Sequence, residues 1–164
     1  MSILKILVLL LVVSFEKPSD ECSKIYLIRH AEKVRTDKSD RDPDLNNKGF
    51  IRAENWKDYF FDKDISKIYS TNYKRTIKTV KPLAESKNLE IIIYSSDDIV
   101  YQDFLDSSIG ENTVVVGHSN TIPDFVNNLI NEDHYGQIDD LTNSNLYIVS
   151  ICNSIITHKL ITVD

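Results

Sequence analysis

Cysteine, glycine and proline are all scarce in this chain. Its 164 residues include two cysteines, four glycines and four prolines. Two cysteines exclude a disulfide-rich scaffold and a zinc site built from cysteine, and so little glycine and proline excludes a collagenous or low-complexity chain. Cys22 and Cys152 leave two possibilities open, one disulfide or two free thiols, because a bridge requires neighbouring positions in the fold.

An excess of basic charge is also missing. Lysine and arginine total 19 against 25 aspartates and glutamates, for a formal net charge of −6. Proteins that bind the phosphate backbone of nucleic acids depend on a basic surface, so nucleic acid is excluded as the main partner. The hydrophobic share of 41% is enough for the core of one domain and too high for a disordered chain.

The longest apolar run covers residues 6–13 and is too short to span a bilayer. It follows Lys5, has no polar face, and is typical of the core of a secretory signal peptide, so a buried amphipathic helix is the weaker interpretation. We therefore predict a signal peptide and short polar leader over residues 1–20, followed by one domain over 21–164. The protein is expected to be exported, periplasmic or extracellular, with no stable membrane span; an uncleaved segment would tether it to the membrane.

From Lys24 onward, short apolar runs alternate with longer amphipathic stretches, which predicts an α/β fold: an open, mostly parallel sheet with helices on both faces. Strands are expected at residues 25–28, 65–69, 90–94 and 113–116. Helices are expected at residues 45–61, 73–87 and 123–130, the second kinked or shortened at Pro82. Residues 97–107 fit a loop or a short helix. Residues 146–151 and 155–162 predict a strand hairpin at one sheet edge.

Two histidine motifs follow strands of this predicted sheet. Arg29-His30-Ala31-Glu32 comes directly after the first strand, and Gly117-His118-Ser119 after the fourth. Open α/β sheets bind ligands just past the carboxyl ends of their strands. A histidine at one strand end is usually structural, but two in equivalent positions favour a shared site.

Two further elements lie between these motifs: Leu45 with Gly49 and Ala53, and the run from Ser70 to Arg75 followed by Thr79. In this order the four elements resemble those of the histidine phosphatase superfamily, in its phosphoglycerate mutase-like branch, which includes small phosphohistidine phosphatases. The resemblance covers about residues 24–130. Arg29-His30-Ala31-Glu32 is similar to the family's Arg-His-Gly-Glu, with Ala31 in place of the glycine.

The resemblance implies a phosphoglycerate mutase-like fold and assigns His30 as the nucleophile that forms a phosphohistidine. It implies that Arg29, Arg75 and His118 bind the phosphoryl group, with His118 part of the catalytic set, and that no metal or organic cofactor takes part. The chemistry of these side chains agrees, because guanidinium groups bind phosphate oxygens in a bidentate manner and a neutral imidazole nitrogen is a nucleophile.

The proton donor to the leaving group is the weakest assignment. Mutase-like members place a carboxylate after the third strand, where this chain has four aspartates: Asp97, Asp98, Asp103 and Asp106. Asp103 best matches the family's distance from Arg75, and Glu32 is a rival. The phosphohistidine phosphatases manage without such an acid, so its absence would narrow the substrates rather than abolish activity.

Structural interpretations stay open for several of these residues. Arg75 could be a solvated helix residue, and Glu32 could pair with Lys33. His134 lies beyond a predicted helix among Glu132, Asp133 and Tyr135, and His158 lies in the terminal strand, so both are interpreted as surface or structural residues. No metal site is expected from the histidines.

We therefore expect a phosphomonoesterase, a histidine acid phosphatase-type hydrolase, that acts on a phosphorylated small molecule or phosphoprotein. The short spacings between His30, Arg75 and His118 leave little room for a cap, which predicts an open site and disfavours a mutase, since a mutase must shield its phosphoenzyme from water. The alternatives are a phosphoglycerate mutase-like phosphotransferase and a non-catalytic phosphate-binding module on the same fold.

Overall fold

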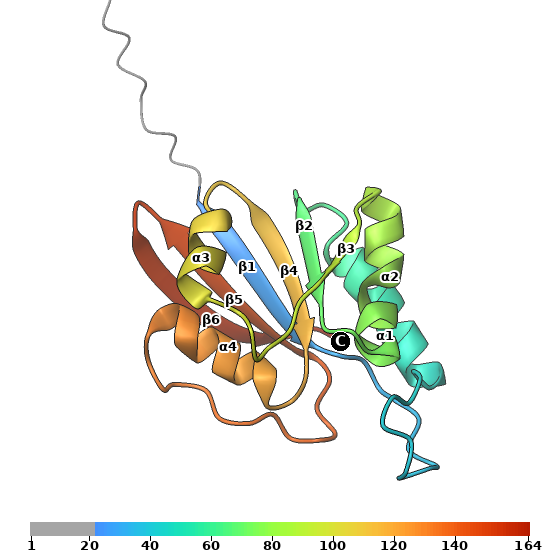
Figure 1. Cartoon of the computed structure of the whole chain (residues 1–164). Helices are drawn as coiled ribbons and strands as arrows, with labels where there is room; N and C mark the ends of the chain where they lie inside the picture. Colours follow the sequence, from blue (N-terminus) through green and yellow to red (C-terminus); the bar gives the residue numbers. More distant parts are fainter. Residues whose placement is uncertain (1–21) are drawn as a thin grey trace, which may run out of the picture.

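Six strands form one sheet in the order β3-β2-β4-β1-β5-β6 in the computed structural model, which describes residues 22–164 (Figure 1). The strands are β1 (Ser23–Arg29), β2 (Lys67–Ser70), β3 (Ile91–Ile93), β4 (Asn112–Gly117), β5 (Asn145–Cys152) and β6 (Ile155–Thr162). The helices are α1 (Asn47–Tyr59), α2 (Lys74–Lys87), α3 (Tyr101–Ser107) and α4 (Thr121–Ile130). The predicted signal peptide lies outside the described residues.

The sheet is parallel except at one edge, as predicted. β3, β2, β4 and β1 pair in parallel, whereas β5 pairs antiparallel with β1 and β6 antiparallel with β5. The β5–β6 hairpin turns at Asn153 and Ser154, both at positive φ. The α/β sheet with a terminal edge hairpin is therefore confirmed.

Helices cover both faces of the sheet because its central strands are apolar on both sides (Figure 1). On one face, Trp56 and Phe60 of the α1 region and Leu83 of α2 pack in one buried cluster. On the other face, Phe104 of α3 and Phe125 of α4 pack edge to face at 5.0 Å. The two layers hold the strand ends in fixed positions.

The helix predicted over residues 73–87 is confirmed as α2, and the helix predicted over 123–130 begins two residues earlier; each contains a proline. α2 runs past Pro82 to Lys87, so Pro82 does not shorten the helix; the buried neighbours Val80, Leu83 and Ala84 hold it against the sheet. α4 begins at Thr121, which places Pro123 in the first turn, where its missing N–H has no intrahelical partner to lose. Residues 101–107 form the short helix α3, one of the two predicted alternatives.

Three segments leave the sheet side by side at the carboxyl ends of β1, β4 and β2. Arg29 pairs with Gly117 in register, and the amide of His30 donates to the Gly117 carbonyl at 2.9 Å. Ser70 pairs with Val116, whose carbonyl accepts from the amide of Thr71 at 3.3 Å. Both histidine motifs and the Ser70–Arg75 segment therefore meet at the carboxyl ends of the parallel strands.

A disulfide joins Cys22 to Cys152, with Cα atoms 4.4 Å apart. The antiparallel pairing of β1 and β5 produces this proximity, since Ser23 lies opposite Ile151. The structure thus decides between the two possibilities that the sequence left open.

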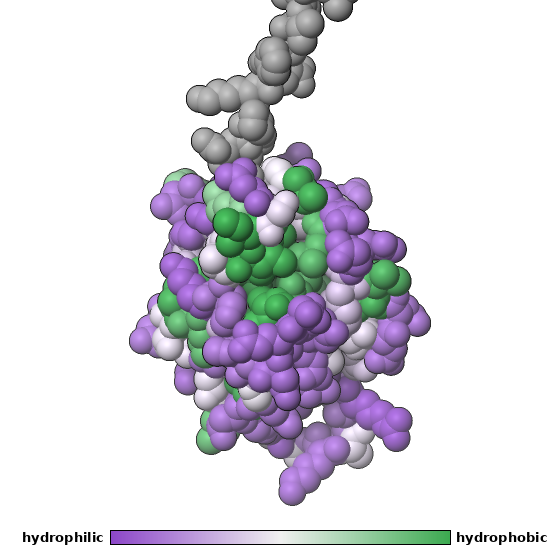
Figure 2. All heavy atoms as spheres, turned by 90° about the vertical axis from the view of Figure 1, so that its left-hand side faces the viewer, coloured by the Kyte–Doolittle hydropathy of each residue, from purple (hydrophilic) through white to green (hydrophobic). Residues whose placement is uncertain are grey.

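The side of the molecule formed by β6 and α3 carries an apolar area surrounded by hydrophilic residues (Figure 2). Exposed apolar residues on β6 and in the turn after α3 are Ile109, Ile155, Ile156 and Leu160. Among the described helices, none has the length and apolar character needed to cross a membrane.

Candidate active site

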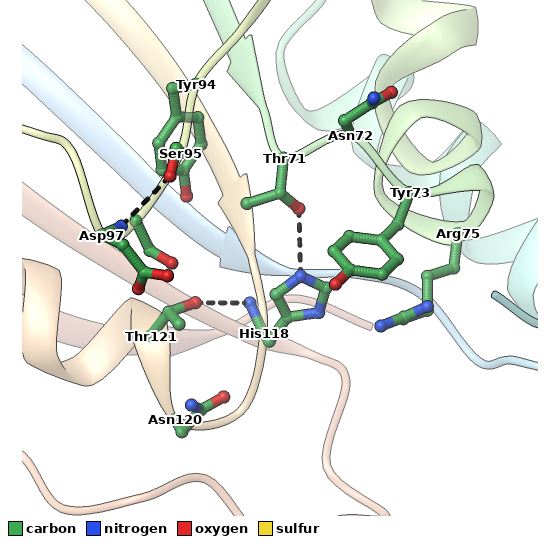
Figure 3. A pocket seen from close by; sticks show the side chains of 11 residues that line it. Thr71, Asn72, Tyr73, Arg75, Tyr94, Ser95, Asp97, His118, Asn120 and Thr121 are labelled. Carbon is green, nitrogen blue, oxygen red and sulfur yellow. Dashed lines mark hydrogen bonds between the residues drawn. The ribbon is translucent and has the colours of Figure 1, made fainter. Parts of the chain in front are cut away.

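A pocket of about 520 Å³ opens where β2, β3 and β4 end (Figure 3). Three segments line it: the start of α2 with the residues before it, the loop after β3, and the turn between β4 and α4. The lining residues are Thr71, Asn72, Tyr73, Arg75, Tyr94, Ser95, Ser96, Asp97, His118, Asn120 and Thr121. The volume suits a phosphoryl group with a small leaving group.

His30 lies beside this pocket, 3% exposed, with its ring centroid 5.6 Å from that of His118. Its Nδ1 is 2.8 Å from the carbonyl oxygen of Ala31. A carbonyl only accepts hydrogen bonds, so Nδ1 carries the proton and Nε2 keeps its lone pair. Burial, supported by the charge of Arg29, lowers the pKa of His30 to about 3, so the imidazole is neutral at ordinary pH.

His118 begins a chain of hydrogen bonds that leads into α2. Its Nε2 lies 3.0 Å from Oγ1 of Thr71, which lies 3.1 Å from Oγ1 of Thr76 (Figure 3). The Thr76 hydroxyl must donate to a carbonyl, that of Thr71 or Tyr73, so it accepts from Thr71, and Thr71 in turn accepts from Nε2–H of His118. Burial, followed by the charges of Arg75 and Arg29, lowers the pKa of His118 to about 4.

Arg75 lies in the first turn of α2 and lines the pocket, as the resemblance implied. Its guanidinium lies 4.3 Å above the ring of Tyr73 and 3.5 Å from the carboxylate of Asp42. Asp42 also accepts from the amide of Lys74 and so caps the helix. The aromatic ring and the carboxylate hold the guanidinium at the pocket wall.

Arg29 does not line the pocket. It is 1% exposed, and the segment between α4 and β5 binds its guanidinium: Nη1 donates to the carbonyls of Asp139 and Thr142, and Nη2 to the Asp140 carboxylate at 2.8 Å. Asp140 also pairs with Arg35. The hydrogen bond from Arg35, with a smaller contribution from Arg29, lowers the pKa of the Asp140 carboxyl to about 2. The expected phosphate ligand is thus ion-paired.

Four buried side-chain polar atoms lack a hydrogen-bond partner within the described part of the chain: Nε of Arg29, Nε of Arg75, Nε1 of Trp56 and Oγ1 of Thr113. The two arginine groups are the ones near the site. Unpaired buried N–H groups are rare in folded proteins. Because Arg75 lines the pocket, an anion bound there would give its guanidinium a partner.

The position of Asp103 does not agree with its predicted role. It is an exposed residue in the first turn of α3, away from the residues that line the pocket. Glu32 does not line the pocket either, because both oxygens of its carboxylate accept from the Nε–H of Arg52, at 2.9 and 3.0 Å. Of the candidate carboxylates, Asp97 is the one the structure brings to the pocket; its amide lies 3.3 Å from Oγ of Ser95.

Several residues of the site could not be found in the sequence. Thr71 and Tyr73 lie within the Ser70–Arg75 motif but had no assigned contact, and Tyr94 and Asp140 carried no signal, since each reaches the site through tertiary folding. Thr79 acquires a clear role: its hydroxyl accepts from the amide of Ala31 at 2.8 Å and donates to the Arg75 carbonyl at 2.7 Å. It joins the segment after His30 to α2.

Comparison with known proteins tests the family resemblance. The sequence pattern of the histidine phosphatase superfamily (branch 1) matches residues 25–96, which include the His30 and Arg75 motifs. The resemblance to the histidine phosphatase superfamily is confirmed. The match ends before His118, so the second histidine motif joins the site through the fold.

Solved structures of histidine phosphatase and mutase proteins share the fold. The protein histidine phosphatase SixA complexed with tungstate is 14% identical, with a TM-score of 0.66 over 85% of this chain and 96% of that one. A mycobacterial glucosyl-3-phosphoglycerate phosphatase is 11% identical, with a TM-score of 0.65 over 86% and 98%. The phosphoglycerate mutase of Bacillus anthracis is 13% identical, with a TM-score of 0.64 over 87% and 93%. No curated protein matches the chain.

Proposed function

We propose that this protein is a phosphomonoesterase that transfers the phosphoryl group of its substrate first to His30 and then to water. The observation that carries the proposal is the tautomer of His30, whose Nδ1–H donates to Ala31 and leaves Nε2 free beside His118. A neutral imidazole with a free lone pair is the form that attacks phosphorus. The fold is shared with SixA, a protein histidine phosphatase whose structure is complexed with the oxyanion tungstate, which supports a phosphatase function.

In the first step, Nε2 of His30 attacks phosphorus and the bond to the leaving oxygen breaks, with a proton passing to that oxygen. Arg75 stabilises the negative charge that spreads over the phosphoryl oxygens. The first N–H groups of α4, which begins at Thr121, face the same pocket and favour an anion there. His118 also lines the pocket beside His30, with its Nε2–H donated to Thr71.

In the second step, water attacks the phosphohistidine, the N–P bond breaks, and inorganic phosphate leaves with Nε2 unprotonated again. A carboxyl group that is protonated at the start gives its proton to the leaving oxygen in the first step, and the carboxylate that results takes a proton from the attacking water in the second. We assign this role to Asp97, because it lines the pocket; in Figure 3, Asp97 and Arg75 lie on either side of His118.

The test is hydrolysis of p-nitrophenyl phosphate and phosphoramidate by the full chain in the presence of a chelator, compared with His30→Ala. We expect turnover in the wild type and a loss of at least about 10³-fold in the variant. Asp97→Asn should slow hydrolysis of an alkyl phosphate, whose strongly basic leaving oxygen needs a proton, more than that of p-nitrophenyl phosphate or phosphoramidate. Asp103→Asn should change none of the three.

Three results would contradict the proposal. Unchanged turnover in His30→Ala would remove its central step. Phosphate binding without hydrolysis of any of the three substrates would establish a non-catalytic binding module, and strict dependence on a bisphosphoglycerate would establish a mutase-like phosphotransferase.

We also propose that the protein is exported, as the apolar run at residues 6–13 suggests. The Cys22–Cys152 bridge supports this location, because disulfides persist mainly in oxidising compartments. Fractionation of expressing cells should find the protein outside the cytoplasm with both thiols oxidised; a cytoplasmic protein with free thiols would contradict the proposal.

A further inference from the structure

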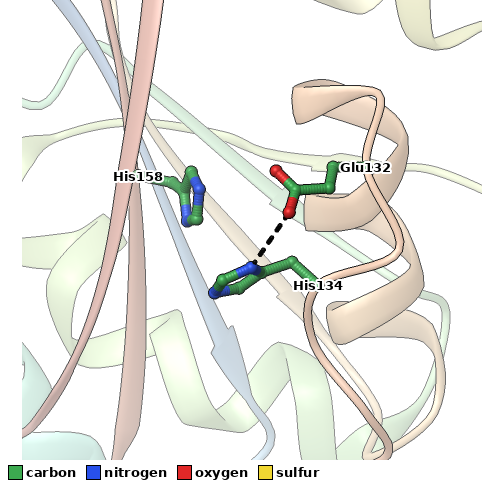
Figure 4. A group of neighbouring side chains, drawn as sticks. All are labelled: Glu132, His134 and His158. Carbon is green, nitrogen blue, oxygen red and sulfur yellow. Dashed lines mark hydrogen bonds and ion pairs between the residues drawn. The ribbon is translucent and has the colours of Figure 1, made fainter.

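Three potential metal ligands meet on the side of the molecule formed by α4 and β6 (Figure 4). Glu132 and His134 follow α4, and His158 lies on the edge strand β6. One ligand atom from each lies within 4.8 Å of the others. None of the three lines the candidate active site.

Their spacing suits a tetrahedral metal ion. Nδ1 of His134 lies 3.3 Å from Oε1 of Glu132. Metal–ligand bonds of about 2.0–2.1 Å at the tetrahedral angle separate two ligands by roughly 3.4 Å. The Glu132 and His134 side chains are 61% and 47% exposed, so a fourth coordination position would open to water.

The ring of His158 is held in the orientation that a ligand needs. Its Nδ1 lies 2.8 Å from the hydroxyl oxygen of Tyr135, which leaves Nε2 free. Metal-binding histidines commonly donate their second ring N–H to an oxygen, which fixes both tautomer and orientation. The Tyr135 ring also packs edge to face against His134, at 4.6 Å between centroids.

The backbone that carries Glu132 and His134 is held by Asn127 of α4. The side-chain oxygen of Asn127 accepts from the amides of His134 and Tyr135, and its amide group donates to the Tyr135 carbonyl. α4 ends at Ile130, and Asn131 follows it with φ 53°; the amide of Glu132 then donates to the Asn127 carbonyl at 3.0 Å. The ligands are therefore positioned before any ion binds.

The charge of the cluster favours a cation. Within residues 22–164, Glu132 pairs with no lysine or arginine, and its ion-pair partner is His134. Asp133 adds a second carboxylate next to it in the chain and accepts from the amide of Asn127 at 3.3 Å. Two imidazoles with one carboxylate form a ligand set that binds zinc and related divalent ions.

We propose that Glu132, His134 and His158 bind a divalent transition metal ion of the zinc class, with Tyr135 orienting His158. The ion joins the loop after α4 to the edge strand β6, and so ties the terminal hairpin to the rest of the domain. Glu132 and His134 are two residues apart in the chain, and folding adds His158 to them. The proposal gives His134 and His158 a role other than the surface or structural one expected from the sequence.

The test is equilibrium dialysis of the full chain against ZnCl₂, with metal content measured per chain. We expect the wild type to bind one Zn²⁺ per chain. The affinity for zinc should fall at least about tenfold in the ligand variants His158→Gln and Glu132→Gln. It should fall about tenfold in Tyr135→Phe, because the hydrogen-bond partner of a metal-binding histidine contributes on that scale. His30→Gln is the matched control, since it removes a histidine of the active site and should leave the bound zinc unchanged.

A second readout separates loss of the site from loss of the fold. Circular dichroism of each variant without metal should match the wild type, and zinc should raise the melting temperature of the wild type but not of Glu132→Gln. No zinc bound to the wild type, or zinc that is lost in His30→Gln and retained in His158→Gln, would overturn the proposal.

Discussion

At the residue scale, the environment of His30 suits the proposed role of this residue as the nucleophile. The Ala31 carbonyl selects the tautomer, and burial makes the protonated form unfavourable. His118 is kept neutral in the same way, and the Thr71–Thr76 chain orients it. Neither histidine needs deprotonation before it acts at neutral pH.

This environment predicts the pH dependence of hydrolysis. The pKa is about 3 for His30 and about 4 for His118, so both rings lose their lone pair only below pH 4. We expect kcat/KM, corrected for the second ionisation of the substrate near pH 6, to stay level from pH 7 to about pH 5 and to fall below about pH 4. An acid limb near pH 6.5, the ordinary value for histidine, would contradict the assignment.

At the element scale, α1 and α2 hold the segment that follows β1. Thr79 of α2 accepts from the amide of Ala31, and Gly49 of α1 lies against the backbone of Glu32. Arg52, also on α1, pairs with the Glu32 carboxylate. Glu32 is therefore a structural link between β1 and α1 rather than an acid of the site.

Gly49 should not tolerate a side chain. A Cβ atom there would lie 2.1 Å from the Glu32 carbonyl oxygen. The other nearest atoms are also backbone atoms of Glu32, so no flexible side chain can move aside to make room. We expect Gly49→Ala to lower the free energy of unfolding by about 2 kcal/mol or more, despite the better helix propensity of alanine, and to reduce turnover by displacing the segment after His30.

Urea unfolding and hydrolysis assays measure the two effects, with Gly136→Ala as the control. A Cβ at Gly136 meets no atom within 4 Å, so that variant should behave as the wild type. Equal stability of the two variants would show that the close approach at Gly49 is not important.

At the scale of the whole molecule, the disulfide joins the start of the described chain to the last hairpin. It spans 130 residues of sequence and connects the beginning of β1 to the end of β5. A bridge over so long a loop strongly restricts the unfolded chain. It acts on stability and lies at the opposite end of β1 from His30.

Loss of the bridge should therefore lower stability and leave the site intact. We expect the double variant Cys22→Ser with Cys152→Ser to lose about 2–5 kcal/mol of unfolding free energy in urea, with kcat/KM unchanged when assayed well below its melting temperature. Reductant should produce the same shift in the wild type and none in the variant. If the wild type were equally stable with and without reductant, this account of the disulfide would be contradicted.

Local patterns in the sequence were enough to predict most of the fold. Apolar runs predicted the buried strands β1 and β4, and the helical spacing of Ala53, Trp56 and Phe60 predicted α1. Such patterns arise because the side chains that each element buries must be apolar and recur with the period of that element. Since strands of a parallel sheet end at one edge, His30 and His118 were also predicted to meet, and their rings lie 5.6 Å apart.

What the sequence determined by itself was the order of elements, the family and the two histidines, because these depend on residues close together in the chain. Tertiary structure decided which distant side chains face one another: Asp97 at the pocket instead of Asp103, Asp140 against Arg29, Cys22 beside Cys152, and Glu132 beside His158. These contacts depend on loop paths and strand register, which follow from packing of the whole chain and leave no periodic signal in the sequence.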